Sequence, residues 1–129
     1  MTALLLDTGA FAMTLTDDPR LPATVRARIE SSDRVALSVI SFYEIGQKVR
    51  LGKWPEMAPF VAGLLDQALA DGFDPIPLSS AAALSAALMD WDHRDPFDRM
   101  IAAVAQAEKL PIVSPDAIFD AIGASRIWG

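Results

Sequence analysis

The segment Leu4-Leu5-Leu6-Asp7-Thr8-Gly9 is a short apolar run that ends in an acidic residue and a turn. Further short apolar runs lie at residues 35–40, 73–78, 111–114 and 126–128. Continuous runs of this length, without polar alternation, are typical of strands that are buried on both faces of a sheet. We therefore predict a sheet of four to five short strands, the first of which ends just before Asp7.

Helical patterns occupy the stretches between these runs. We predict helices at residues 22–31, 41–51, 79–89 and 97–109, and a short one at residues 117–122. A further helix is predicted at residues 60–69, where the side chains expected to face the core are Phe60, Val61, Leu64, Leu65, Ala68 and Leu69. This alternation of strands and helices predicts an α/β domain with three layers, in which a central, mainly parallel sheet lies between helices.

The length of the chain, 129 residues, suits a single domain. The chain contains no cysteine, which excludes disulfides, thiolate metal sites and cysteine nucleophiles and is consistent with a reducing compartment. The N-terminal residues carry no cationic segment, so they do not form a signal peptide. No apolar stretch approaches the roughly 18 residues of a membrane span. We expect a soluble, cytoplasmic protein without a membrane partner.

Hydrophobic residues make up 52% of the chain, and its formal net charge is −6. The apolar fraction exceeds what one small domain buries by itself, so we expect a homodimer or another protein interface. The acidity excludes a broad basic surface for nucleic acid or anionic lipid. The positions of the acids therefore matter more than their number.

Acidic residues follow or adjoin most of the predicted strands. Asp7 ends the first strand, Glu44 lies in the helix after the second, and Asp116 follows the fourth. Asp95 and Asp98 begin the helix that leads into the fourth strand. Because ligands bind parallel sheets at the carboxyl ends of the strands, these acids are expected to converge. Carboxylates without a thiolate select a hard cation such as Mg²⁺ or Mn²⁺, which can activate water for phosphodiester hydrolysis.

Each acid also has a purely structural interpretation. Ser41 and Glu44 have the spacing of a capping box, and Asp95, which precedes a proline, is a good helix N-cap. Asp7 and Asp116 can likewise cap helices or turns. Independent caps do not explain why nearly every strand end carries an acid, so we favour a metal site.

Four segments together resemble the PIN domain family, and within it the small VapC-like toxins of bacterial toxin–antitoxin pairs. The matching segments are Leu4-Leu5-Leu6-Asp7-Thr8, Ser41-x-x-Glu44 with the following Lys48-Val49-Arg50-Leu51-Gly52-Lys53, His93-Arg94-Asp95-Pro96-Phe97-Asp98-Arg99, and Ile112-Val113-Ser114-x-Asp116. They span essentially the whole chain in order, and the Asp-Pro-Phe-Asp-Arg block before an alanine-rich helix is the most specific. Ser114 followed by Pro115 departs from the family, which more often has threonine and then a basic or small residue.

This resemblance implies a single PIN-like domain over residues 1–129 with the three-layer α/β/α fold, and the activity of a Mg²⁺- or Mn²⁺-dependent endoribonuclease. It implies that Asp7, Glu44, Asp98 and Asp116 are the catalytic, metal-binding acids. It also implies an RNA substrate, a homodimer and inhibition by a cognate antitoxin protein, with a higher toxin–antitoxin assembly as a further expectation. These four acids account for most of the net charge of −6, so the acidity does not argue against RNA.

Other polar residues are expected to support this site. Ser41 and Ser114 can supply hydrogen bonds, and Asp95 either acts as a fifth acid or only caps its helix. His93, the only histidine, is more typical of a surface or capping residue than of a catalytic one. Possible RNA contacts are Lys48, Arg50, Lys53 and Arg99. The alternative is a solvated helix end for the first three and ion pairing with a carboxylate for Arg99.

A second hypothesis comes from a different functional class. The chain could be a catalytically silent PIN-fold binding module that only engages a protein partner. This hypothesis predicts partner binding without metal-dependent cleavage of any RNA, whereas the nuclease hypothesis predicts both.

Overall fold

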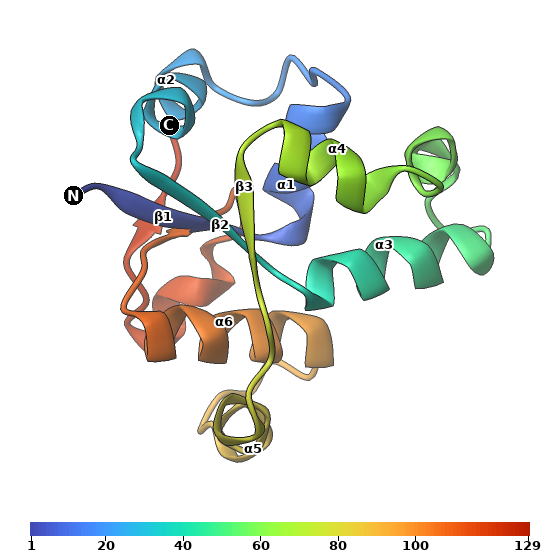
Figure 1. Cartoon of the computed structure of the whole chain (residues 1–129). Coiled ribbons are helices and arrows are strands. Elements are labelled where there is room, and N and C mark those ends of the chain that lie inside the picture. The colour runs from blue at the N-terminus through green and yellow to red at the C-terminus, as the bar shows by residue number, and fades with distance from the viewer.

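A five-stranded sheet with helices on both faces forms the protein (Figure 1), and the computed structural model describes all residues from 1 to 129. The strands are β1 (Ala3–Leu6), β2 (Arg34–Ser38), β3 (Phe73–Ile76), β4 (Ile112–Val113) and β5 (Arg126–Ile127). Their order across the sheet is β3-β2-β1-β4-β5, and every neighbouring pair is parallel. The predicted three-layer α/β/α architecture with a parallel central sheet is confirmed.

The helices connect successive strands across the two faces of the sheet. They are α1 (Thr8–Leu15), α2 (Ala23–Ser31), α3 (Ile40–Arg50), α4 (Leu64–Ala70), α5 (Ser80–Leu88) and α6 (Pro96–Glu108), with 3₁₀ helices η1 (Pro55–Phe60) and η2 (Ala117–Ile122). The helices predicted at residues 22–31, 41–51, 79–89 and 97–109 are confirmed, with ends that shift by one residue. Helix α1 has no counterpart among the predicted helices. No helix has the length and apolarity needed to cross a membrane.

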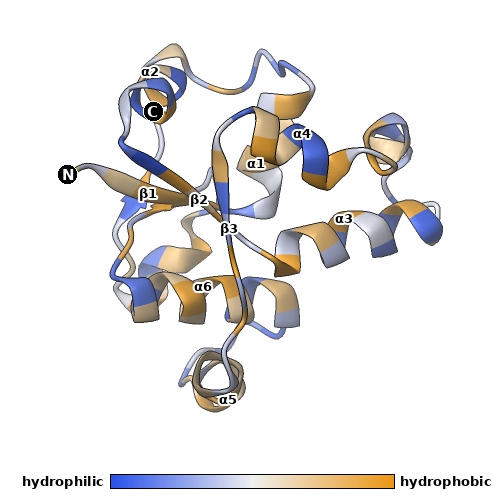
Figure 2. Cartoon of the chain, in the orientation of Figure 1, coloured by the Kyte–Doolittle hydropathy of each residue, from blue (hydrophilic) through white to orange (hydrophobic).

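Alternation of side chains along β1 divides the interior into two main cores. Leu4 and Leu6 point to one face, where they join a cluster with α1 and α3, while Leu5 points to the other face and packs with α5 and α6. Figure 1 shows α5 and α6 on one side of the sheet and α1, α2 and α4 on the other. Strands β1 and β2 are coloured hydrophobic over most of their length in Figure 2, as strands covered on both faces require.

Phe11 of α1 occupies the centre of the first core. Its side chain is fully buried, and its ring meets Phe42 and Phe73 edge-on, with centroids 6.1 and 5.2 Å apart. Edge-to-face contacts of this kind add to the free energy of burying the rings. The three rings come from α1, α3 and β3. Their contacts therefore hold together three elements that are distant from one another in the sequence.

The helix predicted at residues 60–69 is wrong in its extent and in its buried face. Residue 60 ends η1, and α4 begins only at Leu64, after Gly63. Of the predicted stripe, Leu64 and Ala68 are buried, whereas Val61, Leu65 and Leu69 are exposed. The physical reason is the length of α4, since seven residues make two turns and bury only one i, i+4 pair against the sheet.

This correction can be tested with two adjacent leucines. Leu64 is 6% exposed and Leu65 is 52% exposed. We expect Leu64→Ala to lower the free energy of unfolding by about 2–5 kcal/mol because it leaves a cavity in the core. Leu65→Ala should change it by no more than about 0.5 kcal/mol. Urea denaturation of both variants is the measurement, and equal losses would restore the stripe predicted from the sequence.

Candidate functional site

The strand order places several acidic and hydroxyl residues at one edge of the sheet. Because β1 lies between β2 and β4, Asp7 at the end of β1 is flanked by α3, which follows β2, and by Ser114, which follows β4. Helix α6 packs against α3, and this contact brings the acids at the start of α6 to the same edge. Of the acids predicted to converge at the carboxyl ends of the strands, those at the end of β1 and on α3 and α6 therefore lie at one edge of the sheet.

Asp7 is the most deeply perturbed acid of this edge. Its side chain accepts a hydrogen bond from the backbone N–H of Ala10 at 2.8 Å and so caps α1. Burial raises its pKa from 3.8 to about 6, against the opposing effects of the Ser114 hydroxyl and the Ala10 N–H. The negative charges of Asp98 and Glu44 raise this pKa further. Asp7 therefore acts as a helix cap and also carries an ionisation cost that a cap alone would not create.

Glu44 contains a buried carboxylate oxygen that has no partner. Oε2 accepts a hydrogen bond from Nζ of Lys48, one helical turn away, at 2.5 Å. Oε1 is buried and accepts no hydrogen bond. Glu44 as a whole is only 4% exposed, so water has little access to this oxygen. A buried polar atom without a partner costs about 1–3 kcal/mol or more when it is charged. A cation at this edge would satisfy that oxygen.

Asp98 lies in the first turn of α6 within a compact polar group. Its Oδ2 is 2.7 Å from Nε2 of His93. Burial raises the pKa of Asp98, His93 lowers it through a hydrogen bond, and the charges of Asp95 and Glu44 raise it. His93, Asp95 and Asp98 each offer one ligand atom, and these atoms all lie within 4.8 Å of one another.

Asp95 caps α6, as its structural interpretation predicts. Its Oδ1 accepts hydrogen bonds from the N–H groups of Phe97 and Asp98, at 2.8 and 3.3 Å. Pro96 occupies the first helical turn, where its missing N–H is not needed. The cap and the charge effect on Asp98 coexist, so Asp95 is both a structural residue and a neighbour of the acidic group.

Asp116 stands apart from the other three predicted acids. It is exposed and caps η2 by accepting a hydrogen bond from the N–H of Ile118 at 3.1 Å. It does not contribute to the pKa shifts of Asp7 and Asp98. The buried Ser114 hydroxyl accepts a hydrogen bond from the Asp116 N–H at 3.0 Å, which ties this segment to the end of β4.

Ser41 does not form the capping box that its spacing with Glu44 suggests. Helix α3 begins at Ile40, so Ser41 lies inside it, and its cap residue makes no side-chain hydrogen bond. Instead the Ser41 hydroxyl is 2.9 Å from the hydroxyl of Thr8, and both residues are buried. This pair joins the start of α3 to the start of α1. Thr8 and His93 are the site neighbours that sequence reasoning undervalued.

The predicted RNA contacts divide into two groups. Lys48 is half-buried between the Glu44 carboxylate and the ring of Trp54, whose centroid is 5.7 Å from Nζ. Arg50 and Lys53 are exposed at the end of α3, and the structure gives neither an ion pair. These two cations are therefore free to meet a phosphate, whereas Lys48 first neutralises an acid.

Arg99 has no donor left for RNA, which corrects its assignment as a possible RNA contact. Its guanidinium donates hydrogen bonds to the carbonyl oxygens of Ala86, Ala87, Met89, Trp91 and His93, at 2.5 to 3.4 Å. These bonds use all five N–H groups of the side chain. Two of these carbonyls, of Ala86 and Ala87, belong to the last turn of α5 and lack partners within the helix. Arg99 thus anchors the segment that carries His93.

The central acids have the chemistry of a divalent-cation site. Asp7, Glu44 and Asp98 are mutually repelling oxygen donors, and one of the Glu44 oxygens is buried without a partner. Hard cations such as Mg²⁺ and Mn²⁺ take carboxylate oxygens. A cation that reached all three would relieve both the repulsion and the missing hydrogen bond, so the donor chemistry of these residues fits such an ion. The ligand atoms that already lie within 4.8 Å of one another belong to His93, Asp95 and Asp98.

Comparison with known proteins gives a family match and several solved structures of similar fold. The model of the family described as "PIN domain" matches residues 4–125. FitAcB from Neisseria gonorrhoeae is 23% identical, with 96% of each chain covered and a TM-score of 0.71. VapBC2 from Rickettsia felis, bound to a promoter DNA fragment, is 18% identical, with 98% of this chain and 99% of that chain covered and a TM-score of 0.71.

VapC20 from Mycobacterium tuberculosis, a toxin that cleaves the sarcin-ricin loop, is 16% identical. The match covers 98% of this chain and 99% of that chain, with a TM-score of 0.71. No curated protein gives a significant match to the sequence. At these identities the solved structures establish a common fold.

The raised pKa of Asp7 predicts an acid that lowers stability. Its pKa is about 6 in the fold against an ordinary 3.8, so between these values the folded state binds a proton that the unfolded chain has released. Stability therefore falls as pH rises through this window and stays reduced at pH 7. We expect Asp7→Asn to raise the free energy of unfolding at pH 7 by as much as ~3 kcal/mol.

The measurement is urea denaturation in EDTA from pH 3.5 to 7.5. The gain of Asp7→Asn should fade toward pH 3.5, where wild-type Asp7 is protonated in both states. Asp116→Asn is the matched control, because Asp116 is also a helix-capping aspartate but is exposed, and it should show little gain. An Asp7→Asn protein that is no more stable than wild type at pH 7 would contradict the assignment.

The anchoring role of Arg99 predicts a cost for a conservative change. Lysine keeps the charge but cannot reach five carbonyl oxygens from one ammonium group, so Arg99→Lys should lower stability by at least ~2 kcal/mol. Faster hydrogen exchange at residues 89–93 should accompany the loss. Arg94→Lys, at an exposed position without an ion pair, should leave both quantities unchanged. Similar behaviour of the two variants would refute the anchoring role.

Proposed function

Because this chain belongs to the PIN domain family, we propose that it is a Mg²⁺- or Mn²⁺-dependent endoribonuclease that serves as the toxin of a toxin–antitoxin pair. PIN domain proteins are nucleases. The observation that supports metal-dependent hydrolysis most directly is the unpartnered, buried Oε1 of Glu44 beside Asp7 and Asp98. Three carboxylates would repel a phosphodiester, so a cation has to stand between them and the substrate.

Asp7, Glu44 and Asp98 would hold the ion. Asp116, the exposed cap of η2, would be a further and more distant acid. A bound Mg²⁺ or Mn²⁺ supplies Lewis-acid polarisation of the phosphate and lowers the pKa of water. The preference for these ions over softer ones follows from the all-oxygen donor set of the predicted acids.

The other residues of this edge would orient the acids and the RNA. The Thr8–Ser41 hydroxyl pair holds the start of α3 against the end of β1. Lys48 fixes the Glu44 carboxylate by its hydrogen bond to Oε2, so that Oε1 remains available. Arg50, at the end of the same helix, and Lys53, in the turn that follows it, are exposed. They would contact phosphates, which positions the RNA without reading its sequence.

The proposed partners follow from similar proteins and from the surface. Similar structures include a toxin–antitoxin complex from Klebsiella pneumoniae and VapBC from Salmonella typhimurium bound to DNA. Leu84 and Leu88 of α5 are 62% and 74% exposed, and they lie one turn apart on the same face of the helix. We propose that a cognate antitoxin and a second copy of the chain cover such apolar surfaces, which suits a homodimer that can enter a larger toxin–antitoxin assembly. A cytoplasmic location is part of the same proposal.

The test is cleavage of single-stranded RNA by the purified protein with Mn²⁺, with Mg²⁺ and with EDTA. We expect cleavage only with metal, and a loss of at least about 100-fold in Asp98→Asn. Mn²⁺ should also raise the melting temperature of the wild type but not of Asp98→Asn, because a ligand stabilises only the state that binds it.

Asp90→Asn serves as the matched control. It removes an exposed acid on the segment before His93 and should cleave RNA as the wild type does. Undiminished cleavage by a folded Asp98→Asn protein would refute the site assignment. A wild type that cleaves no RNA with either metal, yet binds a protein partner, would favour the silent binding module.

A further inference from the structure

We propose that Tyr43 and Phe97 form a stacking surface for one nucleobase of the RNA, on the two helices that carry Glu44 and Asp98. This inference rests on the proposed endoribonuclease function and adds to it a residue pair that positions the substrate. Neither residue is an acid, a base or a hydrogen-bonding support of the predicted site. The geometry of the two rings carries the proposal.

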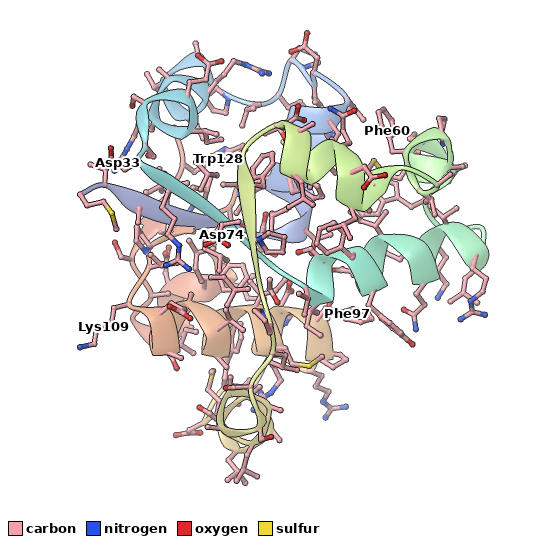
Figure 3. All side chains as sticks on the ribbon, in the orientation of Figure 1. Asp33, Phe60, Asp74, Phe97, Lys109 and Trp128 are labelled. Carbon is pink, nitrogen blue, oxygen red and sulfur yellow. The ribbon has the colours of Figure 1, made fainter.

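Each ring directly precedes an acid of the site in the sequence. Tyr43 precedes Glu44 on α3, and Phe97 precedes Asp98 on α6. The two rings lie against each other with centroids 5.9 Å apart and planes inclined by 42°. Figure 3 shows Phe97 in the first turn of α6, next to the start of α3. The aromatic pair therefore bridges the two helices that supply Glu44 and Asp98.

The exposure of Tyr43 distinguishes it from the other aromatic residues. The residue is 60% exposed, and no other aromatic residue is among the exposed large hydrophobic residues. Phe11 and Phe119 are fully buried, and Trp54 and Trp91 pack against the cores. A tyrosine that leaves most of its ring in water, beside a polar site, is available to a ligand rather than committed to the core.

A nucleobase suits this surface better than an aliphatic side chain. An aromatic face stacks on any base, and such contacts contribute about 1–3 kcal/mol per base. The base must first leave its own stack, which single-stranded RNA permits and a duplex resists. Because the sugar joins each base to a phosphate, an RNA strand whose phosphate meets these acids would carry a base toward the rings on the same two helices.

Helix α3 continues this surface toward its cationic end. Gln47 and Arg50 follow Tyr43 at spacings of four and seven residues, so all three lie on one face of α3. Arg50 is exposed and lies about 10 Å along the helix axis from Tyr43. A single strand that stacks one base on Tyr43 would thus bring a later phosphate to Arg50. The RNA strand would therefore run along α3, from the ring of Tyr43 to the guanidinium of Arg50.

The test compares Tyr43→Ala with Tyr43→Phe, which retains a ring that can stack. We expect Tyr43→Ala to raise KM and the Kd for a short single-stranded RNA by about tenfold, with little change in kcat. Tyr43→Phe should restore both to near the wild-type values. Leu69→Ala, at an exposed apolar position on α4, is the control and should behave as the wild type.

A second measurement reports stacking itself. An RNA that carries 2-aminopurine at successive positions is mixed with the wild-type protein and Mn²⁺, and the fluorescence is recorded by stopped flow before cleavage proceeds. We expect the fluorescence to be quenched at one position in this protein and in its Tyr43→Phe derivative, and the quenching to be lost with Tyr43→Ala.

The outcomes separate this inference from the proposed function. Metal-dependent cleavage by the wild type, with unchanged KM and quenching in Tyr43→Ala, would overturn the stacking surface alone. A wild type that neither binds nor cleaves RNA would overturn both. A Tyr43→Ala protein whose only change is in its oligomeric state or in antitoxin binding would assign Tyr43 to a protein interface and would also overturn the proposal.

Discussion

Repulsion among Asp7, Glu44 and Asp98 is the constraint on which the rest of this structure depends. These carboxylates converge where β1 ends and where α3 and α6 begin, and burial raises the pKa values of Asp7 and Asp98. A folded chain accepts such an arrangement only if the surrounding elements hold it in place. The two hydrophobic cores, one on each face of the sheet, provide that support. Leu4 and Leu6 pack into one core and Leu5 into the other.

Local contacts offset part of the repulsion and leave the remainder for a ligand. Lys48 neutralises one oxygen of Glu44, His93 bonds to Asp98, and the N-terminus of α1 donates to Asp7. None of these contacts reaches Oε1 of Glu44. The same side chains can therefore cap helices and bind an ion, so the structural and the functional interpretations of the acids are not alternatives.

The parts of the fold that sequence predicts correctly are those that local patterns control. Continuous apolar runs identify the strands, and Asp95 with Pro96 marks the start of α6, because caps and periodicity act within a few residues. The prediction fails at residues 60–69, where burial depends on where α4 lies over β3. Ser41 fails for a related reason: its hydroxyl meets Thr8, 33 positions away, rather than a neighbour in its own helix.

The sequence by itself determined which residues are available, namely acids after apolar runs and a helix that begins with Asp95. The tertiary structure decided which of them act together. The strand order β3-β2-β1-β4-β5 surrounds Asp7 with α3 and Ser114. Asp116 instead remains exposed as the cap of η2, and Arg99 uses all its donors on carbonyl oxygens. The physical reason is that burial, charge repulsion and hydrogen-bond satisfaction depend on segments that are distant in the chain, whereas strand and helix patterns do not.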